Sequence, residues 1–429
     1  MKIAFVVQRY GSEVNGGAEL LCRRLAERFS SLWDIDVLTT CAQDYMTWQD
    51  EYQGGVSRLN GVTLKRFPVT FKRNPWLFSR CYDFVAMTEQ ARLRGRGWRL
   101  LHKIYQKTGF QWLVERVWML LQGPYSLSLQ SYIRKHEKEY DIFVFFTYTY
   151  ATTWYSLPAV RHKSIVLPMA HDDVAYRLNV YDQTFQDTEN FIFLTPEEKI
   201  LVEQRVCLTQ KRDVIASLGT EIPEDADGKR FRSQTGILAS FVLYVGRVEE
   251  QKGCPDMVHH FVEYKKKYPS DLKLVVIGKE FWSLPKFEDI IPLGFVDEQC
   301  KIDAMAAAEI LIMPSAFESL SIVLLEAWSV KTPCLVTRAC EVLVGQCERS
   351  QGGMVYDTTE SFINHLHHLL CSPEEVKLLG ENGYRYVQQH YVWEQIEASW
   401  DSLVCEVVQG NRNYQGEKIT SVSPKVRPT

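Results

Sequence analysis

The stretch Leu243-Tyr-Val-Gly246-Arg247-Val-Glu-Glu-Gln-Lys252-Gly253 decides the fold, because it joins an apolar strand, a glycine turn and the start of a helix. Gly246 permits a tight bend, and Arg247 then follows at the carboxyl edge of the sheet, where open α/β folds bind ligands. Arg247 offers a planar fork for phosphate oxygens, and Lys252 adds a second point charge. The two cations predict a diphosphate site. They would also fit a solvated loop partly paired with the two glutamates between them.

A second informative stretch is Phe317-Glu318-Ser-Leu-Ser-Ile-Val-Leu-Leu-Glu326-Ala-Trp, in which an acid stands at each end of an apolar segment. At roughly 100° per residue, Glu326 lies about 80° around a helix from Glu318 and about two turns along it. Carboxylates accept paired hydrogen bonds from vicinal hydroxyls, so one acid could reach a sugar and the other a ribose. The alternative is an exposed acid at each position, but the apolar neighbours of Glu326 disfavour an unpaired charge. The residues predicted to begin this helix, with N–H groups free for phosphate or sugar oxygens, are Ser319, Leu320 and Ser321.

Short apolar runs alternate with helical patterns along the whole chain, which is typical of parallel sheets covered by helices. The chain of 429 residues exceeds the usual size of a single core, so two Rossmann-like α/β domains are expected. The predicted strands are 3–7, 35–39, 62–67, 142–146, 164–168 and 191–195 in the first half, and 241–245, 272–277, 291–293, 310–313, 334–336 and 354–356 in the second. The expected boundaries are 1–210 for the first domain, 211–384 for the second, 385–408 for a closing helix and 409–429 for a disordered tail.

After the first strand, a loop containing Gly16-Gly17 leads into a clearly amphipathic helix. The free N–H groups and the positive dipole end of that helix would form an anion seat at the carboxyl edge of the sheet. Paired glycines also serve as ordinary turn residues. The pattern Gly-x-Gly-x-x-Gly does not follow this strand, which counts against a dinucleotide-dependent oxidoreductase.

A basic helical insertion is expected at about 70–135 in the first domain. Cations greatly outnumber acids there, and aromatic residues are interleaved with them. The segment could lie on an anionic membrane face, receive an anionic acceptor, or form a solvated hairpin with its aromatics packed inward. Its cations between 65 and 116 are Lys65, Arg66, Lys72, Arg73, Arg80, Arg92, Arg94, Arg96, Arg99, Lys103, Lys107 and Arg116.

The overall composition is that of an ordinary soluble protein, with 46% apolar and 24% charged residues. The net charge of -4 gives no case for a nucleic-acid partner. Eleven scattered cysteines without a Cys-x-x-Cys spacing disfavour a zinc site or a disulfide framework. The first apolar run is too short for a secretory signal, and residues 142–160 favour a buried strand and a helix over a membrane span. A cytoplasmic protein is expected.

With these motifs in place, the chain resembles the retaining glycosyltransferases of family 4, which have the GT-B fold of two Rossmann-like domains facing a central cleft. The motifs that carry the resemblance are Gly246-Arg247 with Lys252-Gly253, Leu293-Gly294-Phe295-Val296, and the Glu318-x7-Glu326 spacing. The resemblance implies that Arg247 and Lys252 hold the donor diphosphate, that Glu326 holds the ribose and that Glu318 holds the donor sugar. It also places Gly16-Gly17 opposite the phosphates, and it implies a closing helix that crosses back to the first domain.

His171, in Leu167-Pro-Met-Ala-His171-Asp-Asp, matches the histidine that the family places near the transferred sugar, although a lone histidine after a strand is more often structural. The family mechanism implies retention without a protein nucleophile, and no metal or other cofactor. The chain departs from the family at Ala339-Cys340-Glu341, where a glycine pair usually precedes a donor-site acid, so no role is carried over to Glu341.

The resemblance therefore implies transfer of a hexose from a UDP- or GDP-sugar to a growing glycan or a lipid-linked saccharide, in bacterial surface polysaccharide synthesis. The enzyme would be cytoplasmic, with a possible peripheral site at the inner face of the membrane. Sugar-nucleotide epimerases and phosphorylases share the fold and form a second class. A third reading is a catalytically degenerate module that binds a glycan or a protein partner.

Overall fold

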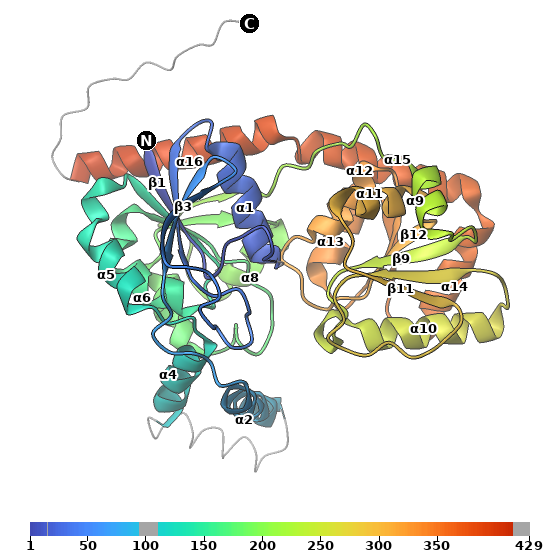
Figure 1. The fold of residues 1–429 in the computed structure, drawn as a ribbon, viewed down its shortest axis with the longest axis horizontal. Coiled ribbons are helices and arrows are strands. Elements are labelled where there is room, and N and C mark those ends of the chain that lie inside the picture. Colours follow the sequence, from blue (N-terminus) through green and yellow to red (C-terminus); the bar gives the residue numbers. More distant parts are fainter. Residues whose placement is uncertain (15, 94–109, 415–429) are drawn as a thin grey trace, which may run out of the picture. The chain divides into compact units, whose positions relative to one another are not determined.

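A computed structural model describes residues 1–14, 16–93 and 110–414 of the chain, which divides into two compact units. Unit 1 comprises Met1–Phe193, Leu201–Ala216 and the residues from Glu397 onward. Unit 2 comprises Leu194–Ile200 and Ser217–Ile396. Each unit is built on its own sheet (Figure 1).

The sheet of unit 1 has the strand order β3-β4-β2-β1-β5-β6-β7-β8, and every neighbouring pair is parallel except β3 with β4. Six of its strands fall where the apolar runs predicted them. The two outermost strands, β3 and β8, were not predicted, because exposed side chains interrupt their apolar pattern. The strands are β1 (Lys2–Val6), β2 (Asp34–Thr40), β3 (Gly55–Leu59), β4 (Val62–Phe67), β5 (Ile142–Phe146), β6 (Ser164–Leu167), β7 (Asn190–Phe193) and β8 (Arg212–Ile215).

The helices of unit 1 pack on both faces of this sheet. Trp400 of the last helix is fully buried, and its ring centroid lies 5.3 Å from that of Phe29 and 6.3 Å from that of Phe5. The predicted basic insertion contains α2, α4 and α5, and residues 94–109 of it lie outside the described residues. The helices within unit 1 are α1 (Gly17–Phe29), α2 (Pro75–Leu93), α4 (Phe110–Gln122), α5 (Leu127–Lys135), α6 (Ala151–Val160) and α7 (Asp182–Asp187). Two further helices, α8 (Pro196–Glu203) and α16 (Trp393–Tyr414), begin in unit 2 and end in unit 1.

The sheet of unit 2 is entirely parallel, with the order β11-β10-β9-β12-β13-β14. The order in which successive strands are added reverses between β9 and β12, and open sheets bind ligands outside the carboxyl ends of the strands at such a switch point. In unit 1 the equivalent point lies between β1 and β5. The strands of unit 2 are β9 (Phe241–Val245), β10 (Lys273–Ile277), β11 (Ile290–Gly294), β12 (Ile310–Met313), β13 (Cys334–Thr337) and β14 (Gly353–Tyr356).

Seven helices cover the unit 2 sheet among the described residues. They are α9 (Gly228–Thr235), α10 (Cys254–Lys267), α11 (Glu298–Ala307), α12 (Ile322–Ser329), α13 (Glu341–Ser350), α14 (Thr359–Cys371) and α15 (Pro373–His390). The final helix, α16, continues to Tyr414, past the end at residue 408 that the sequence predicted. The helical pattern therefore extends into the segment expected to be a disordered tail, and the rest of that segment lies outside the described residues.

All eleven cysteines are free thiols, and six of them are buried. Residues 142–160 form β5 and α6 as predicted. Among the described helices, none combines the length and the apolar character that a membrane span requires.

Candidate functional site

The predicted diphosphate residues lie at the switch point of unit 2. Gly246 and Arg247 directly follow β9, and the neighbouring strand β12 runs into the loop that carries Glu318. Lys252 ends a short 3₁₀ turn, Glu250–Lys252, just before α10. The carboxyl ends of two adjacent parallel strands thus bring Arg247, Lys252 and Glu318 to one edge of the sheet.

Close backbone approaches fix the loops at this edge. Gly253 has a φ of +73°, and a β-carbon there would lie 2.3 Å from the carbonyl oxygen of Pro314. Gly278, which follows β10, has a φ of +147°, and a β-carbon there would lie 1.8 Å from the carbonyl oxygen of Gly246. Only glycine combines such φ values with such short distances, so the three loops pack against one another through glycines.

Arg247 is held by both its backbone and its side chain. The buried hydroxyl of Tyr244 donates a hydrogen bond to the carbonyl oxygen of Arg247 at 2.8 Å. Burial raises the pKa of Tyr244 far above its ordinary value, so this donor stays protonated. The guanidinium Nη2 lies 3.0 Å from Glu249 Oε1, and 38% of the Arg247 side chain is exposed. Arg247 therefore does pair with a neighbouring glutamate, as the alternative interpretation of a solvated loop predicted.

Lys252 pairs instead with the acid from the other strand end. Its Nζ donates to Glu318 Oε1 at 2.8 Å, and the two side chains are 25% and 17% exposed. A cation predicted to bind phosphate and an acid predicted to bind sugar are therefore in direct contact. A phosphate that binds Lys252 would share its ammonium group, which has three N–H donors, with this carboxylate.

Glu326 lies on α12, and its side chain is 5% exposed. Lys301 of α11 provides a partner, because its Nζ lies 2.8 Å from Glu326 Oε2 and 2.8 Å from Glu298 Oε1. The sequence indicated that Glu326 needs a partner in its apolar surroundings but gave no sign of Lys301, which is distant along the chain.

The helix predicted to begin at Ser319 begins only at Ile322. Ser319 and Leu320 form a bend, and Ser321 precedes the helix with a φ of +65°. The helix starts later than predicted because Ser321 has this left-handed conformation. The sequence does not reveal it, since serine rarely adopts such a φ. The carbonyl oxygen of Ser319 accepts a hydrogen bond from Thr195 Oγ1 at 3.3 Å, and the Leu320 side chain is buried.

In unit 1, Gly16 and Gly17 directly precede and begin α1, and they differ in their surroundings. A β-carbon at Gly16 would lie 2.2 Å from Glu19 Oε2, whereas one at Gly17 would meet no atom within 4 Å. Glu19 is buried and accepts from Nε and Nη2 of Arg9 at 2.8 and 2.6 Å. Gly16 therefore makes room for an Arg9–Glu19 ion pair that no motif in the sequence indicated, and Gly17 faces open space.

His171 also lies in unit 1, shortly after β6. Its Nε2 is 3.2 Å from Asp173 Oδ2, and its side chain is 34% exposed. Two neighbouring strand ends near it carry unusual backbone, because Thr147 after β5 has a φ of +63° and Met169 after β6 has a φ of +52°. Residues other than glycine adopt such angles at a cost and often near functional sites.

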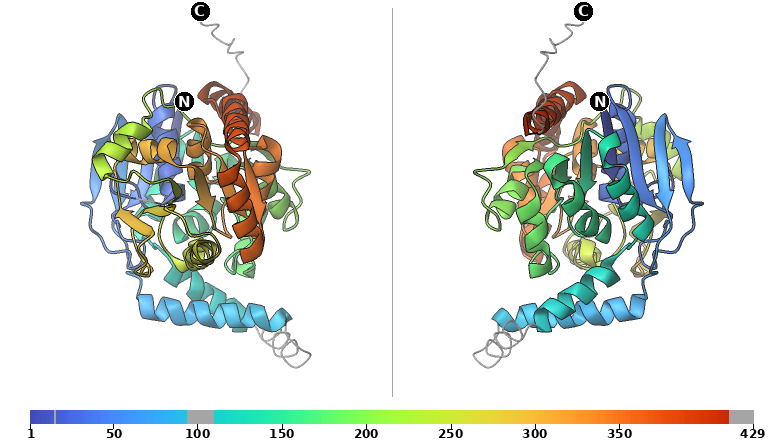
Figure 2. Two further views of the ribbon diagram at one scale, coloured as in Figure 1. Left: turned by 90° about the vertical axis from the view of Figure 1, so that its right-hand side faces the viewer. Right: turned by 90° about the vertical axis from the view of Figure 1, so that its left-hand side faces the viewer.

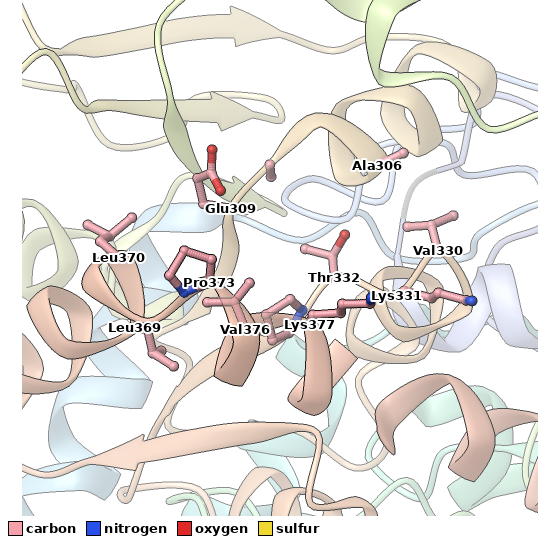
Figure 3. Close-up of a pocket in the computed structure, with 12 residues that line it drawn as sticks. Ala306, Glu309, Val330, Lys331, Thr332, Leu369, Leu370, Pro373, Val376 and Lys377 are labelled. Atoms are coloured by element: carbon pink, nitrogen blue, oxygen red, sulfur yellow. The ribbon is translucent and has the colours of Figure 1, made fainter. Parts of the chain in front are cut away.

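Unit 2 also contains a pocket of about 280 Å³ at the opposite edge of its sheet (Figure 3). Glu309 and Pro333 in its wall directly precede β12 and β13, so the pocket opens near the amino ends of these strands. Arg247 and Glu318 follow the carboxyl ends of their strands. The pocket is therefore separate from the site that these two residues form.

Unit 2 is therefore a Rossmann-like unit with two cations and two acids placed around its strand switch point. Residues 239–372 match the family model described as glycosyl transferases group 1. Two curated relatives are an alpha-monoglucosyldiacylglycerol synthase of Acholeplasma laidlawii, 24% identical over 185 residues, and an MMP alpha-(1->4)-mannosyltransferase of Mycolicibacterium hassiacum, 25% identical over 191 residues. Each match covers 41% of this chain and 46% of the relative, so the matched stretches span less than half the length of these relatives.

Solved structures match over nearly the whole chain. The Anabaena protein HepE, solved in complex with UDP and glucose, has a TM-score of 0.63 at 13% identity, and the match covers 97% of this chain and 100% of HepE. The sucrose-phosphate synthase of Thermosynechococcus elongatus has a TM-score of 0.62 at 16% identity, with the same coverage. The fold is therefore GT-B, as predicted, and the resemblance to the group 1 glycosyltransferases is confirmed.

Proposed function

We propose that the chain is a retaining glycosyltransferase that moves a hexose from a UDP- or GDP-sugar to a growing glycan or a lipid-linked saccharide. One observation carries the proposal: Arg247, Lys252 and Glu318 converge at the switch point of unit 2, and Glu326 lies on the helix that follows. The group 1 match over 239–372 covers all four residues. The solved complex of HepE with UDP and glucose supports a uridine donor, and the name of the Acholeplasma relative, a synthase of a glucosylated diacylglycerol, supports an acceptor that contains a lipid.

Each residue has a proposed role that its chemistry supports. Arg247 and Lys252 bind the diphosphate, Glu326 accepts hydrogen bonds from the ribose hydroxyls, and Glu318 accepts them from the sugar hydroxyls. Glu318 is in contact with Lys252, so the sugar and the β-phosphate would be bound side by side. Gly17, with open space before the first turn of α1, and His171 are the proposed contributions of unit 1.

The proposed reaction needs no protein nucleophile. The bond between the anomeric carbon and the leaving phosphate oxygen breaks, the acceptor hydroxyl attacks from the same face, and the departing phosphate takes the acceptor's proton. Negative charge develops on the leaving diphosphate, and Arg247 and Lys252 would stabilise it. Two fixed cations supply the charge that a divalent metal provides in other transferases, so we propose that the reaction is independent of metal.

A screen of UDP, GDP, ADP and their sugar conjugates by thermal shift, with and without EDTA, tests the proposal. A ligand that binds only the folded state raises the melting temperature. At a concentration of 100 times its Kd, it adds about 2.7 kcal/mol to the free energy of unfolding. We expect stabilisation by one nucleotide, unchanged by EDTA, and transfer from the corresponding sugar conjugate. A response that EDTA removes would contradict metal independence. No response to any nucleotide would favour the degenerate binding module, and interconversion of the sugar conjugate without an acceptor would favour an epimerase.

The proposed ribose contact gives a prediction for Lys301. The variant Lys301→Met removes the cation 2.8 Å from Glu326, which leaves the buried carboxylate less compensated and less well oriented. We expect the affinity for the cognate nucleoside diphosphate to fall about tenfold, while the affinity for inorganic pyrophosphate stays unchanged. Titration calorimetry measures both. Lys266→Met, at an exposed lysine of α10, is the matched control. An equal loss for both ligands would assign Lys301 a purely structural role.

A further inference from the structure

Helix α4 has apolar side chains on its exposed face as well as on its buried one. Its exposed stripe is Phe110, Leu113, Val117 and Leu120, which follow one another at helical spacing and are 40% to 52% exposed. The opposite face buries Gln111, Glu115, Trp118 and Met119. A surface helix of a soluble protein normally has a polar outer face, so the exposed apolar stripe requires an explanation.

The exposed apolar surface extends beyond α4. Of the twenty large hydrophobic side chains that are exposed among the described residues, ten lie between residues 71 and 127. Trp76 and Trp112 are 67% and 62% exposed. Figures 1 and 2 show α2 and α4 side by side, projecting from unit 1 away from its sheet. We call these side chains the hairpin face. Its members are Phe71, Trp76, Leu77, Met87, Phe110, Trp112, Leu113, Val117, Leu120 and Leu127.

Hydrogen bonds hold the pair of helices α2 and α4, which we call the hairpin, against the rest of unit 1. The Glu115 carboxylate accepts from Gln111 Nε2 at 2.7 Å and from the backbone N–H of Val180 at 2.6 Å. Trp118 Nε1 donates to the hydroxyl of Tyr181 at 3.1 Å. The buried guanidinium of Arg73 donates to the carbonyl oxygens of Leu121 and Tyr45 at 2.8 and 2.9 Å. The inner side of α4 and the residue two positions before α2 are therefore fixed by hydrogen bonds.

The exposed charges on the described parts of both helices are mainly positive. Arg80 lies 5.7 Å from the centroid of the Trp76 ring, and Arg116 lies 4.9 Å from that of Trp112. Lys72 is also exposed, and Asp83 is an exposed acid on α2. In the sequence, the residues 94–109 between the described helices contain five Arg and Lys residues and no Asp or Glu. Tryptophan beside arginine suits a boundary between water and hydrocarbon, where the ring is buried and the cation meets lipid phosphates.

We propose that the hairpin face docks on the surface of an anionic lipid bilayer. A second copy of the chain is a poorer partner, because a two-fold contact would bring Arg80 and Arg116 against the same cations. A small soluble anion would leave the apolar stripe uncovered. A bilayer receives both features, since the apolar side chains enter the acyl boundary and the cations bind anionic headgroups. The proposal stands on this surface alone and does not depend on the proposed transfer reaction.

Vesicle cosedimentation of the full chain tests the proposal. We expect binding to phosphatidylcholine vesicles that contain phosphatidylglycerol, weak binding to phosphatidylcholine alone, and a decrease as salt concentration rises. The double variant Leu113→Gln/Val117→Gln should weaken binding at least about tenfold, because each apolar side chain loses its burial. Arg80→Gln/Arg116→Gln should weaken it by a factor of about 5 for each cation removed. Leu238→Gln/Leu378→Gln, at exposed leucines of unit 2, should have no effect.

Three outcomes would overturn the proposal: equal binding by the hairpin variants and the wild type, equal binding to both kinds of vesicle, or a dimer in sedimentation that Leu113→Gln/Val117→Gln dissociates without any vesicle binding. An unchanged melting temperature shows that a variant is folded. The vesicle assay contains no nucleotide, so a chain that binds vesicles but no nucleoside diphosphate would fail the proposed function and still support this surface.

Discussion

Replacing Glu318 by glutamine should lower the rate of sugar transfer by a factor of about 100 to 1,000, a typical loss when one preorganised contact to the transition state is removed. The substitution keeps the size of the side chain and removes its charge. The sugar hydroxyls then lose an anionic acceptor. Lys252 loses the carboxylate that lies 2.8 Å away, so its ammonium group becomes more available to phosphate.

The two consequences of Glu318→Gln can be measured separately. Steady-state rates with the nucleotide sugar report the loss of transfer, and calorimetry with the nucleoside diphosphate should show an affinity equal to or higher than that of the wild type. Glu360→Gln, at an exposed acid of α14, is the control for the chemical change. Near-normal transfer would remove Glu318 from the site, and a parallel loss of nucleotide affinity would assign it to folding of the loop.

The variant Arg247→Ala should weaken binding of the nucleoside diphosphate by a factor of about 10 to 100, because a hydrogen bond to a charged group contributes about 1.5–3 kcal/mol. The transfer rate should fall by a further factor, since charge on the leaving phosphate increases in the transition state. The double variant Arg247→Ala/Lys252→Met should lose more nucleotide affinity and more transfer rate than Arg247→Ala alone, because both cations would bind the same diphosphate.

Comparing ligands of different charge identifies the cause. The Kd of the nucleoside diphosphate should rise in Arg247→Ala, and that of the uncharged nucleoside should stay the same. Arg385→Ala, at an exposed arginine of α15, controls for the loss of a surface cation. If the nucleoside is affected equally, Arg247 shapes the pocket rather than binding phosphate. A fully active Arg247→Ala enzyme would refute the site.

Much of the fold could be predicted because the buried strands are short apolar runs with clear ends. β5 and β12, in which every side chain is buried, were predicted to the residue. The edge strands β3 and β8 were missed, because neither contains a buried side chain and so neither forms an apolar run. The two motifs around Arg247 and Glu318 were visible because the glycines and acids that form them are close along the chain.

The partners of the site residues could not be predicted in the same way. Lys301 and Arg9 reach Glu326 and Glu19 only after the chain has folded, so no local spacing marks them. The start of α12 was misplaced because the left-handed conformation of Ser321 depends on packing of the loop rather than on its own sequence. Contact between Lys252 and Glu318 likewise follows from the adjacency of β9 and β12 in the sheet.

The glycine contacts at the unit 2 site also define where this protein can be re-engineered. Gly253 against Pro314, and Gly278 against Gly246, leave no room for a β-carbon, so a mutagenesis library should keep these positions constant. Phe317 is 38% exposed on the same loop and can be randomised without disturbing that backbone. In a selection for new donor sugars, the glycine positions should therefore stay constant and the substitutions should be concentrated at exposed loop positions such as Phe317.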